Sequence, residues 1–244
     1  MKIRALATFS SRGGRPVQED YVVGSDQKGL FAIADGFGGP GPGATAAKTA
    51  CEAVKSFLIK EAGDLEATLP FELRNYFSLA GNVLFNALIH ANRKVQKMNH
   101  GKPPQERGGA SVLAGFVDGS LLALANVGAC SAWLIRDNQM VELVIPRTYA
   151  RLAEPFSTDL REELKCPLIA LGMGDHLEPE IFEYRLYPGD WLFFQTDGVP
   201  ESIRNDLLAA RLQNQPENQV FRQIQADMES APTGDNLSGL LAIL

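Results

Sequence analysis

Short apolar runs separated by polar turns make up most of the chain, and a few longer stretches carry the helical period. Runs typical of strands occupy residues 2–10, 21–23, 30–35, 110–117, 121–127, 131–135, 140–144, 180–187, 191–195 and 237–244. Helices are predicted at 44–60, 70–98, 207–212 and 220–228. Residues 146–167 hold few large apolar side chains and are expected to form an irregular surface segment with one short helix near 159–165.

The order of these elements predicts an α+β fold. Strands come in runs and helices come in pairs, without one-by-one alternation. This order favours antiparallel sheets covered by helices over a parallel sheet with crossover helices. Because no repeat, low-complexity linker or block of charge interrupts the sequence, we expect residues 1–244 to form a single domain.

One of the apolar runs ends in a carboxylate that is followed by glycines. Phe31-Ala32-Ile33-Ala34 leads directly into Asp35, and Gly36, Gly38 and Gly39 come next. A run of this kind is typical of a strand buried on both faces, which would hold Asp35 rigidly at its exit. Glycines allow the backbone to turn sharply and to approach a ligand closely. The alternative is an ordinary strand that ends in an Asp-Gly turn.

Acidic residues lie at the ends of three further strands. Asp197-Gly198 follows an apolar strand, Asp235-Asn236 precedes the last one, and Glu19-Asp20 precedes an early one. Carboxylates gathered at one sheet edge repel each other and need cations. Oxygen ligands without His or Cys select Mg²⁺ or Mn²⁺, and a bridged pair of such ions makes a hydrolytic site. Four independent turn carboxylates are the alternative that the pattern leaves open.

Composition and charge exclude several classes of protein. The formal net charge of −6 does not suggest a nucleic-acid partner, and no apolar run approaches the ~20 residues that span a bilayer. The N-terminal apolar stretch is too short for a secretory signal. Cys51, Cys130 and Cys166 are odd in number and widely spaced, so we expect buried reduced thiols in a soluble cytoplasmic protein without a membrane partner.

Four ordered motifs resemble the signatures of the metal-dependent protein phosphatases, the PPM family of type 2C serine/threonine phosphatases, in the form of their bacterial members. They are Arg15-Pro16-Val17-Gln18-Glu19-Asp20, Asp35-Gly36-Phe37-Gly38-Gly39, Thr196-Asp197-Gly198-Val199 and Asp235-Asn236-Leu237-Ser238. Weaker matches lie at Gly109-Ala110-Ser111, Ala125-Asn126-Val127-Gly128 and Pro188-Gly189-Asp190. The resemblance covers essentially the whole chain, and it implies an α-β-β-α sandwich of two antiparallel sheets between helix pairs.

The resemblance also implies a set of metal ligands. Asp35 would bridge two Mn²⁺ or Mg²⁺ ions, and the Gly36 carbonyl would ligate one of them. Asp197 and Asp235 would complete the other ion's ligands. Glu19 and Asp20 would bind directly or through water at the shared edge.

The resemblance further implies a substrate and a reaction. Arg15 would hold the phosphate through the planar fork of its guanidinium. A metal-bridged water or hydroxide would attack phosphoserine or phosphothreonine of a phosphorylated protein in line, without a phosphoenzyme. The enzyme would then work in signal transduction, opposite a serine/threonine kinase.

Several positions depart from the family pattern. Gln18 replaces the usual Asn, and Pro40 stands where a histidine is often found. Ala129 replaces the Asp that binds a third, weaker metal, so the third metal site is expected to be absent. A regulatory pseudophosphatase that binds phosphoproteins with weak or no turnover is therefore an alternative. A two-metal hydrolase of another substrate, such as a nucleotide, is a further one.

Overall fold

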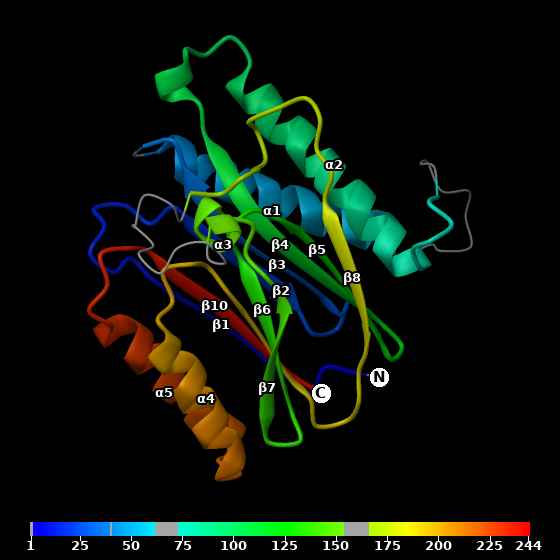
Figure 1. Cartoon of the computed structure of the whole chain (residues 1–244), viewed down its shortest axis with the longest axis vertical. Helices are drawn as coiled ribbons and strands as arrows, with labels where there is room; N and C mark the ends of the chain where they lie inside the picture. Colours follow the sequence, from blue (N-terminus) through cyan, green and yellow to red (C-terminus); the bar gives the residue numbers. More distant parts are fainter. Residues whose placement is uncertain (1, 40, 62–72, 154–165) are drawn as a thin grey trace.

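The computed structural model describes residues 2–39, 41–61, 73–153 and 166–244, and its core is two stacked antiparallel sheets (Figure 1). The first sheet has the strand order β1 (Ala5–Ser11), β10 (Leu237–Ile243), β9 (Trp191–Gln195), β6 (Ser131–Arg136) and β7 (Gln139–Val144). The second has the order β2 (Asp20–Ser25), β3 (Leu30–Phe37), β4 (Gly109–Asp118), β5 (Leu121–Val127) and β8 (Glu180–Arg185).

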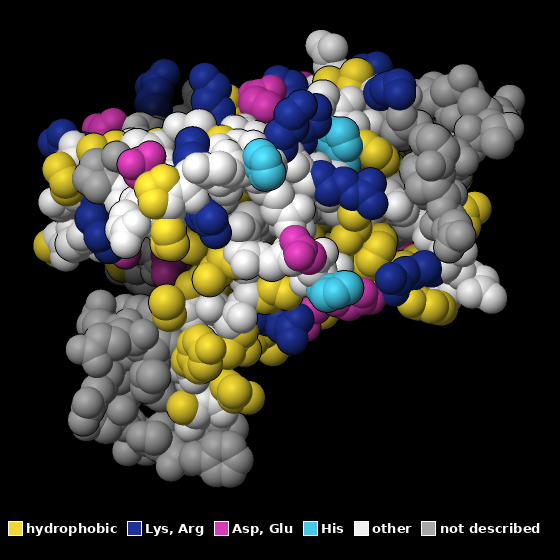
Figure 2. Space-filling model, turned by 90° about the horizontal axis from the view of Figure 1, so that it is seen from above, with side chains coloured by type: hydrophobic (Ala, Val, Ile, Leu, Met, Phe, Trp, Pro, Cys, Tyr) yellow, Lys and Arg dark blue, Asp and Glu magenta, His cyan; other side chains and the backbone are white. Residues whose placement is uncertain are grey.

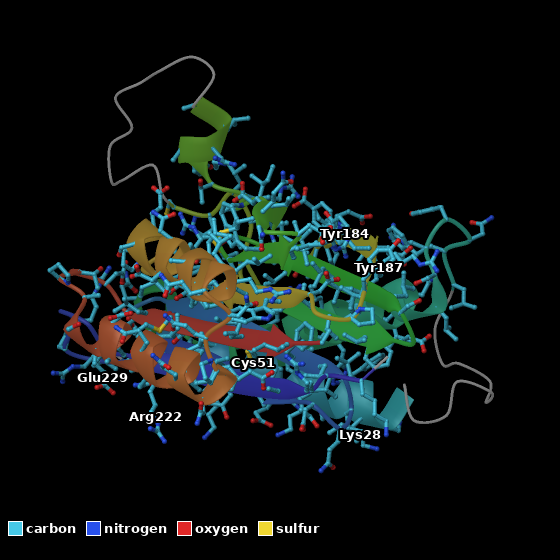
Figure 3. All side chains as sticks on the ribbon, turned by 90° about the horizontal axis from the view of Figure 1, so that it is seen from below. Lys28, Cys51, Tyr184, Tyr187, Arg222 and Glu229 are labelled. Atoms are coloured by element: carbon cyan, nitrogen blue, oxygen red, sulfur yellow. The ribbon has the colours of Figure 1, made fainter. Side chains whose placement is uncertain are left out.

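Two helix pairs cover the outer faces of the sheets. Helices α1 (Pro42–Glu61) and α2 (Leu79–Asn99) pack on the second sheet, and α4 (Glu201–Leu212) and α5 (Glu217–Ser230) pack on the first (Figure 1). On α5, Val220, Ile224 and Met228 are buried, whereas Arg222 and Glu229 point outward (Figure 3). The predicted α-β-β-α sandwich of antiparallel sheets is confirmed.

Three apolar layers hold the sandwich together, one under each helix pair and one between the sheets. The middle layer contains Phe31 and Ile33 from β3, Phe194 from β9 and Leu240 from β10. Because side chains on a strand alternate between its faces, the residues two positions further along each strand point into the same space. At one end of the sandwich these positions carry polar side chains, namely Asp35, Ser111, Asn126, Thr196 and Ser238.

The boundaries of all four predicted helices differ from the sequence prediction. Helix α1 begins at Pro42, because proline is compatible with the first turn, where no N–H partner is needed. Helix α2 begins at Leu79 and not at Pro70, since the Ser78 hydroxyl caps it by accepting from the Gly81 N–H at 3.0 Å. Helices α4 and α5 are both longer than predicted.

The segment predicted to be irregular contains the short helix α3 (Tyr149–Ala153) in its described part. The helix expected near 159–165 lies outside the described residues, as does Pro40. Hydrophobic side chains gather on the surface at the lower left of Figure 2. The described residues 145–152 include the exposed side chains of Ile145, Tyr149 and Leu152.

The expectation of buried thiols holds for two cysteines and is wrong for the third. Cys51 lies inside the molecule (Figure 3), and Cys130 is also buried. Cys166 is exposed at the edge of the site described below. Among the described residues, no helix is both long and apolar enough to cross a membrane.

Candidate active site

A cleft of about 1110 Å³ opens at the polar end of the sandwich, where loops from both sheets meet. The second sheet contributes Asp35 and Gly36 at the exit of β3, and the segment before β2 contributes Arg15 and Glu19. The first sheet contributes residues that follow β9 and precede β10, among them Asp197 and Asp235. The fold therefore brings six of the seven predicted site residues to the wall of one cleft.

Strand register explains the position of the seventh residue, Asp20. In the β2–β3 pair Asp20 is directly opposite Asp35. Its side chain is buried, 6% exposed, and does not line the cleft. The Thr196 hydroxyl donates to Asp20 Oδ2 at 2.8 Å and accepts from the Ser238 N–H at 3.0 Å. Asp20 thus lies behind Asp35, held by the hydroxyl of Thr196, a residue that a sequence motif contains but that we did not predict as a site residue.

The carboxylates are close enough to shift each other's protonation. Burial raises the pKa of Asp35 well above its usual value, and the charges of Asp197, Asp20 and Asp235 raise it further. Burial likewise raises the pKa of Asp20 to about 7, against the opposing effect of its hydrogen bond from Thr196. The carboxylates of the cluster therefore repel each other when ionised, and together they attract cations.

Glu19 lines the cleft, and hydrogen bonds to its backbone fix its position. Its N–H donates to Asn236 Oδ1 at 2.9 Å, and its carbonyl accepts from the Gly36 N–H at 3.2 Å. A side chain at Gly36 would meet the Gly43 carbonyl oxygen at 2.2 Å, so only glycine fits there. Glu19 Oε1 is buried against Gly43 at the start of α1. Burial raises the pKa of Glu19, and the charge of Arg15 and a hydrogen bond from the Ala44 N–H oppose this rise.

Arg15 and Asp235 contact each other at the wall of the cleft. Arg15 Nε donates to Asp235 Oδ1 at 3.0 Å, and both side chains remain about half exposed, at 52% and 44%. This hydrogen bond raises the pKa of Arg15, and the charges of Asp235, Glu19 and Asp35 act in the same direction. The guanidinium therefore lies within the field of the carboxylate cluster, and part of Asp235 is engaged by it.

The donor set fits a hard divalent cation. The set consists of oxygens only, and the mutual repulsion of its carboxylates disfavours it without cations. Within the ranges that the structure describes, no three Asp, Glu, His or Cys side chains already surround a common metal position. The ion pair with Arg15 holds one predicted ligand, Asp235, toward the guanidinium.

Ala129, the position predicted to have lost the ligand of a third metal, is buried. Ala129 is 2% exposed, and its methyl group supplies no oxygen. The adjacent Gly128 carbonyl accepts from the Arg147 N–H at 2.8 Å, which ties the start of the 146–167 segment to this turn. A third ion would have to be bound by other residues.

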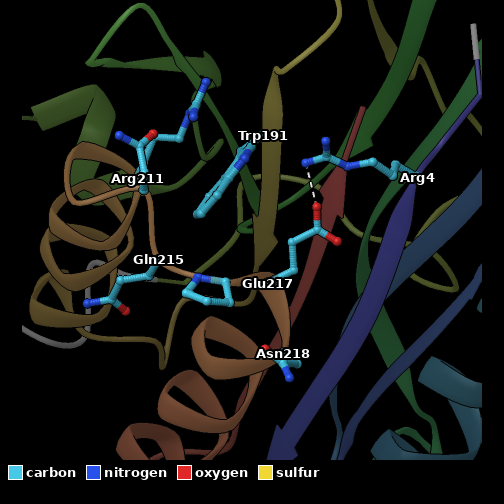
Figure 4. Close-up of a pocket in the computed structure, with 8 residues that line it drawn as sticks. Arg4, Trp191, Arg211, Gln215, Glu217 and Asn218 are labelled. Atoms are coloured by element: carbon cyan, nitrogen blue, oxygen red, sulfur yellow. Dashed lines mark ion pairs between the residues drawn. The ribbon is translucent and has the colours of Figure 1, made fainter.

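A second cavity of about 530 Å³ lies where α4 connects to α5 (Figure 4). Arg4 forms an ion pair with Glu217 there, and Arg211 Nη2 donates to the Gly189 carbonyl at 3.3 Å. Its charged groups are thus engaged within the protein. It contains one carboxylate, Glu217, and we place the functional site at the cleft around Asp35.

Comparison with known proteins was made by sequence and by structure. No protein-family profile matches the sequence, and no curated protein matches it either. Solved structures do match. The PPM Ser-Thr phosphatase MsPP of Mycobacterium smegmatis, in complex with cacodylate, is 24% identical with a TM-score of 0.77 and full coverage of both chains. The catalytic domain of the phosphatase PstP, in complex with two manganese ions, is 21% identical with a TM-score of 0.76. The match covers 100% of this chain and 99% of that one.

A staphylococcal structure extends the likeness. The serine/threonine phosphatase Stp1 of Staphylococcus aureus is 18% identical with a TM-score of 0.78, and the match covers 100% of this chain and 96% of that one. At sequence identities of 18–24%, the similarity to these solved structures establishes the fold of the chain. From end to end, the chain has the fold of the PPM serine/threonine phosphatases.

Proposed function

We propose that the chain is a metal-dependent protein serine/threonine phosphatase that hydrolyses phosphoserine and phosphothreonine. The observation that carries this proposal is the meeting of Asp35, Asp197 and Asp235 with Arg15 in one cleft. Carboxylates at the exits of strands from both sheets suit a pair of hard cations, and a guanidinium beside them suits a phosphate dianion. The whole-chain likeness to PPM phosphatases supports the same assignment.

In this proposal Asp35, the Gly36 carbonyl, Asp197, Asp235 and Glu19 hold two Mn²⁺ or Mg²⁺ ions, and Asp20 supports Asp35 from behind. Bound ions of this kind lower the pKa of water and neutralise charge on a phosphoryl group. Arg15 exchanges its contact with Asp235 for the substrate phosphate and orients it by two parallel hydrogen bonds.

The substrate in this proposal is a phosphorylated protein, made by a serine/threonine kinase that the enzyme opposes in cytoplasmic signal transduction. The cleft is open and half-exposed Arg15 lies at its mouth, which suits a phosphorylated side chain presented on a protein surface. Residues 1–244 act as one catalytic domain.

The proposal is tested by phosphate release from a phosphothreonine peptide and from a small aryl phosphate, with Mn²⁺, with Mg²⁺ and with chelator. Turnover is expected only with metal, and Asp35→Asn should abolish it. Asp118→Asn changes an exposed carboxylate at the end of β4 and serves as the matched control. Turnover that survives chelation or the Asp35 substitution would refute the proposal, and preference for a nucleotide over the phosphopeptide would point to the other hydrolase class.

Buried Ala129 favours a second candidate, a pseudophosphatase that binds phosphoproteins. This protein would bind the phosphothreonine peptide in Mn²⁺ without releasing phosphate at any metal concentration. Ala129→Asp restores a carboxylate at the turn before β6. A rise in turnover in that variant would show that the missing ligand limits activity, and no change would exclude this explanation.

A further inference from the structure

The segment that carries Arg15, residues 12–18, has no secondary structure of its own and is bound by residues 233–236 just before β10. Gly14 N–H donates to the Thr233 carbonyl at 3.0 Å. Gly13 has a φ of +55°, and a side chain on it would meet the Asp235 carbonyl oxygen at 2.0 Å. The two segments therefore pack backbone against backbone, and the position of Arg15 depends on how firmly they are joined.

A single buried side chain joins both ends of this segment. Asn236 is 5% exposed, and its Nδ2 donates to the Arg12 carbonyl at 2.9 Å and to the Val17 carbonyl at 3.0 Å. Its Oδ1 accepts from the Glu19 N–H at 2.9 Å. Both amide hydrogens and the amide oxygen are thus used, and the partners flank Arg15 on both sides in the sequence.

The chemistry of the amide suits this role, because it offers two donors and an acceptor on one short side chain. An aspartate would keep an acceptor for the Glu19 N–H but would present an oxygen to two carbonyl oxygens. An alanine would leave two buried carbonyls and one N–H without partners. Asn236 also follows Asp235 directly, so the residue that orders the Arg15 segment is adjacent to a predicted metal ligand.

We propose that Asn236 is a positioning residue for phosphate recognition, which fixes the segment around Arg15 in the geometry that meets the substrate. The inference rests on the proposed function, since it takes Arg15 as the phosphate ligand. Asn236 does not touch substrate in this account, and it acts through Arg15. Its loss should weaken substrate binding much more than it slows the chemical step.

The matched control is Asn82, a second buried asparagine with the same kind of bonding. Its Nδ2 donates to the Arg74, Phe77 and Ser78 carbonyls at 2.9–3.2 Å, and its Oδ1 accepts from the Arg74 N–H at 2.7 Å. It lies in the first turn of α2, at the end of the helix opposite to Asn99, which contacts the backbone behind the cleft at Gly108. Asn82→Ala should lower stability without changing substrate binding.

The experiment compares Asn236→Ala and Asn82→Ala by KM and kcat for a phosphothreonine peptide in Mn²⁺. We expect Asn236→Ala to raise KM about tenfold, as expected for the loss of one charged hydrogen bond to phosphate, with kcat within about threefold of wild type. In an Arg15→Ala background the same substitution should change KM by less than about twofold, because its effect passes through Arg15. An unchanged KM, an equal rise in Asn82→Ala, or an undiminished rise without Arg15 would each overturn the inference.

Two further readouts do not depend on turnover. Binding of inorganic phosphate to the manganese-loaded protein, measured by calorimetry, should weaken about tenfold in both Asn236→Ala and Arg15→Ala. Trypsin should cut after exposed Arg12 faster in Asn236→Ala than in wild type or Asn82→Ala, as followed by mass spectrometry. If wild type shows no turnover with either metal, the proposed function fails, and these readouts alone decide the inference about Asn236.

Folding failure is also informative. If Asn236→Ala does not fold, the nearly isosteric Asn236→Asp replaces it, with the same expected rise in KM. If neither variant folds while Asn82→Ala does, Asn236 is required for folding, and its assignment as a positioning residue is wrong.

Discussion

The space between the two sheets has an apolar middle and a polar end, built from the same strands with the same alternation. Phe31 and Phe194 meet in the middle with ring centroids 4.6 Å apart. Two to four residues further along the same strands, Asp35 and Thr196 occupy the equivalent face. The middle stabilises the sandwich by burying apolar surface, whereas the end gathers carboxylates that oppose burial. The same strands thus build an apolar core that stabilises the fold and a polar end whose carboxylates destabilise it when no cation is bound.

The largest expected effect separates activity from stability at the polar end. Asp35→Asn should reduce metal-dependent phosphate release by at least about 1000-fold, since it removes the carboxylate that we propose to bridge the two ions. The same change should raise the free energy of unfolding of the metal-free protein by about 0.5–2 kcal/mol, because a buried charge is gone. Urea unfolding in chelator checks the second point, and a destabilised variant would contradict the comparison.

The apolar middle should respond in the opposite way. Phe194→Ala removes a buried ring that packs on Phe31, and it should lower the free energy of unfolding by about 3–5 kcal/mol. Leu212→Ala, at the exposed end of α4, should cost less than about 1 kcal/mol. Equal effects of the two substitutions in urea unfolding would show that the inter-sheet layer is not the main source of stability.

The pH dependence of the metal-free protein should come from the polar end. The pKa of Asp20 is raised from 3.8 to about 7 in the folded chain, so the fold favours the protonated form. The contribution of Asp20 to the free energy of unfolding is complete below about pH 4 and is lost as the pH rises toward 7. Its size is about 1.4 kcal/mol for each unit by which the folded and unfolded pKa values differ. The melting temperature measured in chelator should therefore fall from pH 5 to pH 8.

Asp20→Asn provides the comparison for this pH effect. The amide does not titrate, so the slope of stability against pH should be shallower than in wild type between pH 5 and pH 7. A slope equal to that of wild type would place the titrating group elsewhere.

The smallest expected effect concerns the ion pair at the mouth of the cleft. Arg15→Ala breaks a half-exposed contact with Asp235, and the free energy of unfolding should fall by less than about 1 kcal/mol. Titration calorimetry should find Mn²⁺ bound at least as tightly as in wild type, because Asp235 has lost its competitor. Weaker Mn²⁺ binding would mean that Arg15 supports the metal site instead of competing with it.

The sequence predicted the strands and the acidic residues of the cleft, because apolar alternation and carboxylates at strand exits are local patterns. The four-layer arrangement and the place of Arg15 at the site came from the family resemblance. It did not predict the start of α2, which depends on the Ser78 cap and on the four hydrogen bonds of Asn82. It also did not distinguish Asp20, behind the cleft, from Glu19 at its wall. That difference follows from the register between β2 and β3 and from Thr196 on the other sheet, neither of which is a local property.

The role of Asn236 was hidden for the same reason. Its hydrogen-bond partners lie more than 200 positions away in the sequence, and they are backbone groups whose residue types carry no signal. The contact between Arg15 and Asp235, separated by 220 positions, likewise requires the three-dimensional fold.

The central claim is that Asp35 bridges two divalent cations, and diffraction from crystals soaked in Mn²⁺ tests it most directly. The account predicts two anomalous peaks in the cleft, each about 2 Å from an Asp35 carboxylate oxygen. One ion should contact Asp197 and Asp235, and the other should contact Glu19 and the Gly36 carbonyl. A cleft without ions at Asp35 in Mn²⁺-soaked crystals, or a single ion that Asp35 does not touch, would contradict it.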